Sequence, residues 1–218
     1  MDWFQQFDAY CERTDLSYWS EPINALTNAA FIIAAIIMWR RTKGIAGAQV
    51  LCAILFAIGV GSYLFHTHAT AWASLADVAP IGIYILTYLF LTNRDIVGWP
   101  LWGALIGTLA FVPYAALLVP ILNQLPFFQI SNFYWTVPIL LLIYAFALRK
   151  KHPATATGFV LGAALLCLSI ATRSVDEMFC MTIPIGTHFL WHCLNGLMLG
   201  YMIHVYSTHV LAGRASQR

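Results

Sequence analysis

The sequence predicts an all-α integral membrane protein, a seven-transmembrane helix bundle, from its composition, its apolar stretches and the distribution of its basic residues. Of the 218 residues, 61% are hydrophobic and only 9% are charged. Soluble domains are about half apolar and about one quarter charged, and a soluble fold of this size cannot cover so much apolar surface. The composition therefore excludes a soluble enzyme, a nucleic-acid-binding protein and a disordered protein.

Seven apolar stretches are bounded by glycines or charged residues, and each can cross the hydrocarbon as a helix, which takes about 17–25 residues. In chain order they are residues 22–40, 46–66, 77–93, 98–119, 132–149, 155–172 and 186–207. They account for nearly the whole chain. We therefore divide it into an acidic extracytoplasmic segment (1–21), a seven-helix transmembrane domain (22–210) and a cytoplasmic tail (211–218).

The basic residues predict the orientation in the membrane. Nine of the 11 Lys and Arg follow odd-numbered spans, and only Arg13 and Arg173 fall on the opposite side. Because cytoplasmic loops carry the excess of Lys and Arg, the N-terminus is expected outside or in a lumen and the C-terminus in the cytoplasm. Eight of the nine carboxylates map to the outer side. The host membrane would be the inner membrane of a bacterium, or the ER, Golgi or plasma membrane of a eukaryote.

Three histidines are expected at one outer level of the bundle. His66 ends the second span, and His188 and His192 open the seventh. The pair is four residues apart, so both imidazoles lie on one face of a helix. Three imidazoles are the ligand set of a catalytic zinc site whose fourth position stays open, and the lack of redox chemistry in zinc suits hydrolysis.

Two further side chains are expected beside these histidines. Asp77, eleven residues after His66, stands at the start of the predicted third span and could take and return a proton. Ser62, one turn below His66 on the same helix face, could orient the attacking water or donate to a developing oxyanion.

The histidine cluster also has other interpretations. The imidazoles could simply hydrogen-bond between helices, or serve a bis-histidine haem, which three histidines at one level fit poorly. A receptor or transporter could use them as a non-catalytic metal or ligand site. Ionisable residues at membrane depth favour a functional interpretation.

Cys11 and Cys180 are both predicted on the outer side. An oxidising exterior would permit a disulfide between them, and the alternative is two free thiols that share a side.

These residues make the chain resemble the alkaline ceramidase family, which belongs to a wider superfamily of seven-helix hydrolases that includes adiponectin-receptor-like proteins. The motifs that carry the resemblance span nearly the whole chain. They are Tyr-Cys-Glu-Arg at 10–13, Trp19, Glu21, Asn24 to Asn28, Gly61 to His66, Asp77 with Pro80, Asp176 with Cys180, and His188-Phe-Leu-Trp-His192.

The resemblance implies a zinc ion held by His66, His188 and His192, with Asp77 as proton shuttle and Ser62 stabilising the oxyanion. It also implies the Cys11–Cys180 pairing. The reaction implied is hydrolysis of the N-acyl bond of ceramide to a free sphingoid base and a fatty acid. Relatives bind calcium through N-terminal oxygens, and calcium takes six to eight of them. The corresponding candidates here are Asp8, Tyr10 (by its backbone carbonyl), Glu12, Thr14 or Asp15, and Glu21.

The substrate is left open beyond a lipid amide that reaches the site from the bilayer. The short loops and the lack of an N-x-S/T sequon look prokaryotic, so another N-acyl lipid is an alternative to ceramide. The sequence gives no prediction of the oligomeric state.

Overall fold

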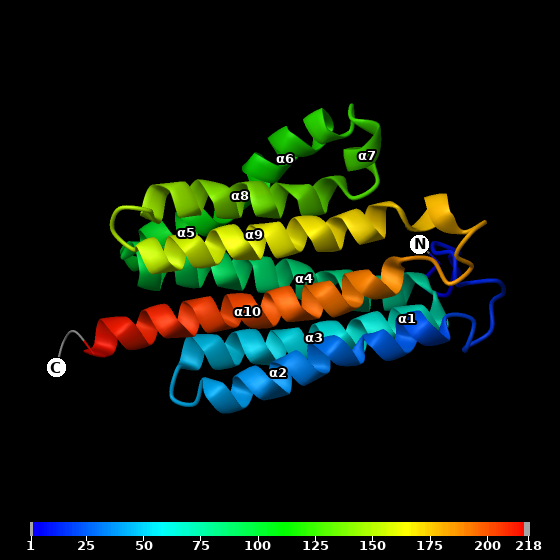
Figure 1. Cartoon of the computed structure of the whole chain (residues 1–218), viewed down its shortest axis with the longest axis horizontal. Helices are drawn as coiled ribbons and strands as arrows, with labels where there is room; N and C mark the ends of the chain where they lie inside the picture. The colour runs from blue at the N-terminus through cyan, green and yellow to red at the C-terminus, as the bar shows by residue number, and fades with distance from the viewer. Residues whose placement is uncertain (1, 216–218) are drawn as a thin grey trace.

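The computed structural model describes residues 2–215, which form long helices joined by short loops (Figure 1). Within these residues, Gln6 and Thr70 form one isolated antiparallel β-bridge. The elements are α1 (Pro22–Thr27), α2 (Ala29–Arg41), α3 (Ala46–His68), α4 (Ala71–Leu91), the π-helical turn η1 (Thr92–Val97), α5 (Leu101–Leu109), α6 (Phe111–Leu122), α7 (Pro126–Gln129), α8 (Asn132–Leu148), α9 (Pro153–Ser174), the 3₁₀ turn η2 (Asp176–Phe179) and α10 (His188–Ala215).

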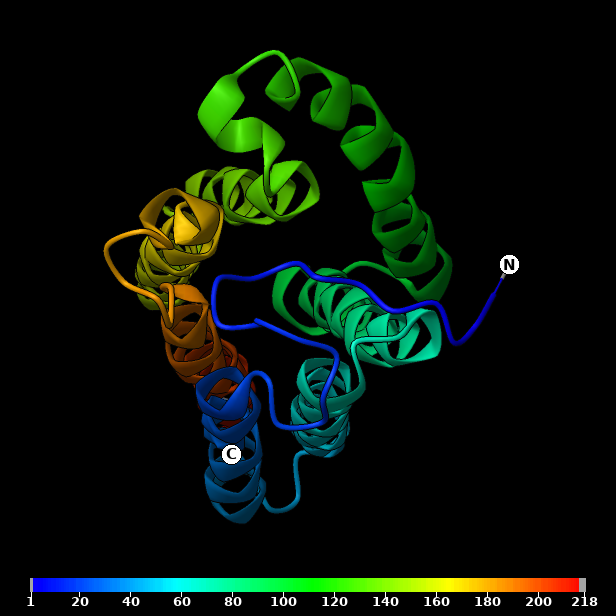
Figure 2. The ribbon, with the colours of Figure 1, turned by 90° about the vertical axis from the view of Figure 1, so that its right-hand side faces the viewer.

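The helices form one ring of neighbours. Helix α3 packs against α4 and α2, α10 packs against α2 and α9, and α8 packs against α9, while α5 and α6 connect α4 back to α8. Seen from the end where the chain begins, the N-terminal segment crosses the end of this ring (Figure 2). The fold therefore places residues 2–21 above the helix ends that carry the three histidines.

Five of the predicted spans correspond to helical segments that are long and apolar enough to cross a bilayer. They are Pro22–Arg41, Ala46–His68, Ala71–Val97, Leu101–Leu122 and Pro153–Ser174. Helix α8 is apolar but has only 17 residues. Helix α10 has 28 residues and carries four histidines, which lower its hydropathy. The chain is a multi-pass membrane protein, and the count of seven spans stays a prediction.

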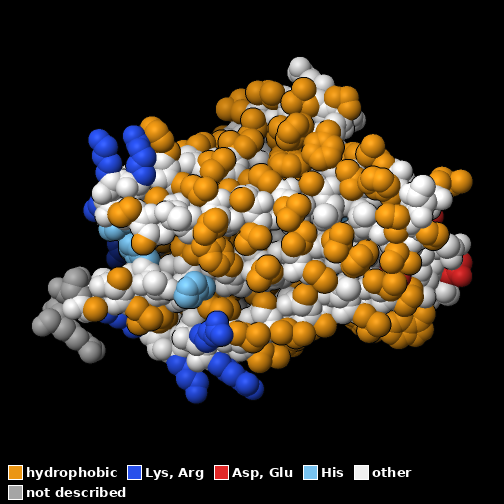
Figure 3. Space-filling view, viewed as in Figure 1, with side chains coloured by type: hydrophobic (Ala, Val, Ile, Leu, Met, Phe, Trp, Pro, Cys, Tyr) orange, Lys and Arg blue, Asp and Glu red, His pale blue; other side chains and the backbone are white. Residues whose placement is uncertain are grey.

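Most charged side chains lie at one of the two ends of the bundle. On the face shown in Figure 3, Lys and Arg lie toward the end where α10 finishes, the visible Asp and Glu lie at the opposite end, and hydrophobic side chains cover the length between them. This separation is the one expected from the sequence, whereas the side of the membrane that each end faces is a prediction from the positive-inside rule.

The predicted start of the third span is wrong, because α4 begins at Ala71 and not at residue 77. The chain reverses just before it, where Ala69 takes a left-handed conformation (φ 49°) and Thr70 is extended. Asp77 therefore lies nearly two turns inside α4. A carboxylate is a poor marker of a helix end when its side chain faces a cavity rather than lipid.

Two predicted single spans are each divided into two consecutive helices. Residues 98–119 become α5 and α6, which meet at Ala110. Pro113 has no N–H to bond the carbonyl four residues before it, which explains the break. Residues 22–40 become α1 and α2, which meet at Asn28. The Asn28 amide donates to the backbone carbonyl of Asn24 at 2.8 Å.

Candidate metal centre and active site

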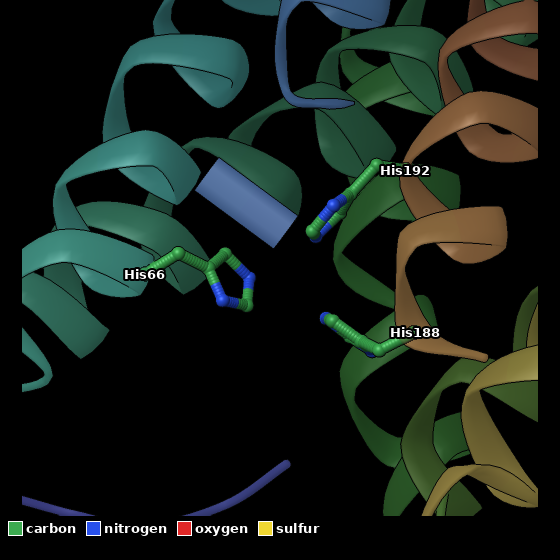
Figure 4. Close-up of side chains that lie close together, drawn as sticks. All are labelled: His66, His188 and His192. Atoms are coloured by element: carbon green, nitrogen blue, oxygen red, sulfur yellow. The ribbon is translucent and has the colours of Figure 1, made fainter. Parts of the chain in front are cut away.

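Three buried imidazoles meet between the end of α3 and the beginning of α10. His66 comes from α3, and His188 and His192 come from the first turns of α10 (Figure 4). Their ring centroids lie 4.6–5.1 Å apart, and each side chain is at most 2% exposed. Their ligand nitrogens all lie within 4.8 Å of one another, which suits one metal ion. The structure thus brings together the three histidines expected from the sequence.

Hydrogen bonds fix how two of these rings face the centre. The Thr27 hydroxyl donates to the Ile23 carbonyl at 2.8 Å, so its oxygen accepts the Nδ1–H of His192 at 2.9 Å. The Glu21 carboxylate accepts the Nδ1–H of His66 at 2.6 Å. With Nδ1 protonated, the Nε2 lone pair of each ring is free to bind a metal, and such outer partners raise the basicity of the ligand.

Orphaned nitrogens at the centre fit a metal ion. Within residues 2–215, Nδ1 of His188 and Nε2 of His192 are buried and have no hydrogen-bond partner. A buried polar atom without a partner is costly, and a cation bound to Nε2 of His192 would remove that cost for this ring. The donor set, three neutral imidazoles and an open position, fits zinc.

The N-terminal segment holds His66 through a buried ion pair. The Arg13 Nε donates to Glu21 Oε1 at 2.5 Å, and Arg13 Nη2 donates to the backbone carbonyl of His66 at 3.0 Å. Arg13 is 4% exposed and Glu21 is 2% exposed. Burial opposes ionisation of Glu21, but the hydrogen bond from His66, together with Arg13 and Asn24, holds the pKa of this carboxyl below its ordinary value.

His188 is positioned by Tyr10 and by Asp176. The Tyr10 ring stacks on the His188 imidazole with centroids 3.7 Å apart. Oδ1 of Asp176 accepts the backbone N–H of Thr187 at 2.6 Å and of His188 at 2.8 Å, which caps the beginning of α10. Oδ2 of Asp176 accepts the N–H of Cys11 at 3.0 Å. One carboxylate therefore links the N-terminal segment to the helix that carries two of the three histidines.

The predicted disulfide is confirmed: Cys11 and Cys180 are bonded. Gly186, beside them, takes a positive φ of 63°, and a side chain there would overlap Asp176. The bond closes the N-terminal segment onto the loop before α10, over the histidines.

Asp77 and Ser62 lie at the edge of this centre. The Asp77 carboxylate interacts with the Ser62 hydroxyl and electrostatically with His66. Gly61 makes this arrangement possible, because a side chain there would collide with the backbone carbonyl of Ala76 on α4. The close approach of α3 and α4 sets Ser62 beside Asp77.

A cavity of about 300 Å³ opens beside His188. Asp8, Tyr10, Asp77, Arg173 and His188 contribute its polar lining. We call it the reaction cavity.

A second, apolar cavity of about 60 Å³ shares Ile81, Tyr134 and Trp191 with the reaction cavity and extends along the bundle to Met198 and Met202. The reaction cavity, which carries several polar side chains, thus continues into an apolar cavity.

The predicted calcium ligands do not gather in this structure. Within the described residues, the histidine triad is the group of three or more His, Cys, Asp or Glu side chains that could hold an ion. The carboxylate of Glu12 accepts the N–H groups of Ile23 and Asn24 at 2.7 and 2.8 Å and so caps α1. Burial raises the pKa of Glu12, and these two N–H groups oppose the rise.

The other calcium candidates are dispersed. The backbone carbonyl of Tyr10 accepts the N–H of Arg13 at 3.1 Å, and Glu21 bonds Arg13 and His66 as described above. The backbone N–H of Thr14 bonds the Ser20 hydroxyl. Asp8 and Asp15 are exposed. Calcium binding stays a prediction.

Several residues of the site were not assigned their roles from the sequence. Glu21 was expected to bind calcium and instead contacts His66, while Thr27, Asp176 and Arg173 were given no role. Thr27 and His192 are 165 residues apart, and no local pattern marks such a contact. The sequence does single out Arg173 in one respect, because Arg13 and Arg173 are the two basic residues on the acidic side of the predicted topology.

The fold and the site together define a class, a helical membrane protein with a buried cluster of three histidines, able to hold a metal ion, at one end of its bundle. The ceramidase family model matches residues 9–218, nearly the whole chain, and the chain belongs to that family. A search among curated proteins finds no significant match. Membership of the family implies a hydrolase that acts on the amide bond of a membrane lipid.

Proposed function

We propose that this protein is a zinc-dependent intramembrane amidase that hydrolyses the N-acyl bond of ceramide or a similar lipid to a free amine and a fatty acid. The observation that carries the proposal is the cluster of three buried imidazoles, of which His188 lines a cavity together with the Asp77 carboxylate. Nδ1 of His188 and Nε2 of His192 are buried without a hydrogen-bond partner among the described residues, whereas a cluster that served only to join helices would pair them.

Zinc held by the three histidines would supply Lewis-acid chemistry toward water and toward the amide carbonyl. Glu21 and Thr27 keep the His66 and His192 rings in the ligating tautomer and orientation. The burial of the triad excludes competing bulk water from the ligand nitrogens.

Asp77 is the proposed general base and acid. It accepts the proton that water loses on attacking the carbonyl carbon, and returns it to the amide nitrogen as the C–N bond breaks. The Ser62 hydroxyl interacts with the Asp77 carboxylate, and its proposed role is to donate to the oxyanion that develops on the carbonyl oxygen. The acyl chain would extend into the apolar cavity bordered by Tyr134 and Trp191.

The test is zinc content and fatty-acid release, measured on wild type and on His188→Ala. We expect about one zinc per wild-type chain, measured by mass spectrometry of metal-replete protein, and loss of both zinc and hydrolysis in the variant. Metal-replete wild type without zinc would contradict the metal site. Stoichiometric zinc without release of fatty acid from any lipid amide would favour the alternative of a receptor or transporter.

A further inference from the structure

The Arg173 side chain faces the reaction cavity and, within the described part of the chain, forms no ion pair with a carboxylate. It stands in the last turn of α9, is half-buried, and lines the cavity with Asp77 and His188. We propose that its guanidinium binds an anionic group, a carboxylate or a phosphate, on the amine half of the lipid substrate. This inference rests on the proposed amidase function and narrows its substrate class.

Contacts on one side hold the guanidinium in place. Nη1 donates to the Ser131 hydroxyl at 2.8 Å and lies 3.4 Å from the Ile130 carbonyl. The group lies over the Tyr134 ring at 5.3 Å and near the Trp191 ring at 5.9 Å. A guanidinium held in one orientation can donate two parallel N–H groups to two oxygens of a carboxylate or phosphate.

The charge of Arg173 has no close carboxylate. The two ion pairs found among residues 2–215 are both made by Glu21, with Arg13 and with His66. Arg173 interacts with Asp77 and the Tyr10 hydroxyl, but no carboxylate oxygen approaches it within ion-pair distance. An arginine carries five N–H donors, and a half-buried guanidinium with donors to spare favours an anionic partner.

Arg13 shows what a purely structural arginine does in the same site. Its Nε bonds Glu21, and its terminal nitrogens bond the backbone carbonyls of Asp15 and His66. It is fully buried and lies behind His66, away from the cavity lining. Arg173 differs in both respects, since it faces the cavity and has no carboxylate partner.

The position of Arg173 selects the amine half of the substrate. The apolar cavity leads from Trp191 to Met202, toward the middle of the bundle, and suits an acyl chain. Arg173 lies over Tyr134 and Trp191, where the two cavities meet, and lines the reaction cavity with Asp8 and Tyr10. When the acyl chain occupies the apolar cavity, the group attached to the amide nitrogen remains in the reaction cavity that Arg173 lines.

The negative charge of the cavity carboxylates does not outweigh the positive charge that favours an anionic substrate. Asp8 and Asp77 contribute two negative charges, while Arg173 and a divalent metal contribute three positive ones. Arg13 and Glu21 neutralise each other. A divalent metal bound at the histidines would therefore leave the side chains that line the cavity with one net positive charge, which favours an anionic ligand.

The experiment compares three amides with one acyl chain: N-palmitoylethanolamine (neutral), N-palmitoylglycine (carboxylate) and N-palmitoyl-O-phosphoethanolamine (phosphate). We expect wild type to favour one or both anionic lipids over the neutral one in kcat/KM. Arg173→Met should lower that ratio by about 10- to 100-fold, the worth of a charged hydrogen bond, and Arg173→Lys should retain part of it. The carboxylate and phosphate arms identify which anion is preferred.

The matched control is Ser131→Ala, which removes the clamp on Nη1 and keeps the guanidinium. A purely structural Arg173 would lower kcat/KM for all three lipids alike, and Ser131→Ala would mimic it. Equal ratios in wild type and Arg173→Met would overturn the anion proposal while hydrolysis itself stands. If no amide, ceramide included, is hydrolysed by zinc-loaded wild type, the amidase function fails instead.

Discussion

Glu21→Gln should weaken metal binding and destabilise the fold through two different contacts of one side chain. Oε1 of Glu21 accepts from Arg13, and Oε2 accepts from His66. A glutamine has one acceptor oxygen and can serve only one of these donors. Loss of a partner behind a metal-bound histidine costs about 10- to 100-fold in metal affinity, or about 1.4–2.7 kcal/mol.

The stability effect follows from the burial of the ion pair. Both side chains are nearly inaccessible to solvent, so removing the carboxylate leaves the Arg13 guanidinium without its counter-charge. Breaking a buried pair in this way costs about 3–5 kcal/mol. The double variant Glu21→Gln with Arg13→Met removes the stranded cation, and should recover stability without restoring the support of His66 by a carboxylate.

Zinc affinity is measured by competition with a chelator, and stability by thermal unfolding in detergent. Glu12→Gln is the matched control, because Glu12 caps α1 from the same segment without touching a histidine. It should lower stability while leaving zinc affinity within about twofold of wild type, far below the outer-ligand effect. Glu21→Gln with wild-type zinc affinity would refute the role of this carboxylate as the support of His66.

Three other predictions concern turnover, helix contact and the disulfide. Asp77→Asn should keep zinc, by mass spectrometry, and lose about 10²- to 10⁴-fold in kcat; wild-type turnover would remove Asp77 from the mechanism. Gly61→Ala should lower the free energy of unfolding by about 1–3 kcal/mol through overpacking, and should reduce activity. The control Gly82→Ala, whose added methyl group meets open space, should leave the melting temperature equal or higher. Equal effects of the two substitutions would contradict the close contact of α3 and α4. Reduction of Cys11–Cys180 should lower the melting temperature and release zinc faster, and an unchanged zinc off-rate would show that the bond does not hold the segment over the site.

The local parts of the site could be predicted from the sequence. The His-x-x-x-His spacing places His188 and His192 on one helix face, and the alternation of spans brings His66 to the same end. The structure confirms this grouping. Composition predicted the helical membrane class, and five spans meet the criteria of length and hydropathy.

The contacts made between distant segments could not be predicted. In the sequence, Glu21 is one of several carboxylates on the outer side. In the folded chain its Oε2 lies 2.6 Å from Nδ1 of His66, which is 45 residues away in sequence. Asp77 was placed at a helix end because a charge usually marks one, but the cavity that accepts it is formed by several helices and by the N-terminal segment. Motif spacing describes one element at a time, whereas these contacts depend on how elements pack.

The division of the metal ligands between α3 and α10 has a consequence for biosynthesis. His66 and its partner Glu21 are made in the first third of the chain, but His188 and His192 arrive 122 and 126 residues after His66. No nascent chain therefore contains all three histidines until the beginning of α10 has been translated. If the histidines bind the proposed metal, the complete site can form only once synthesis has reached α10, and chains that end before α10 would lack two of the three ligands.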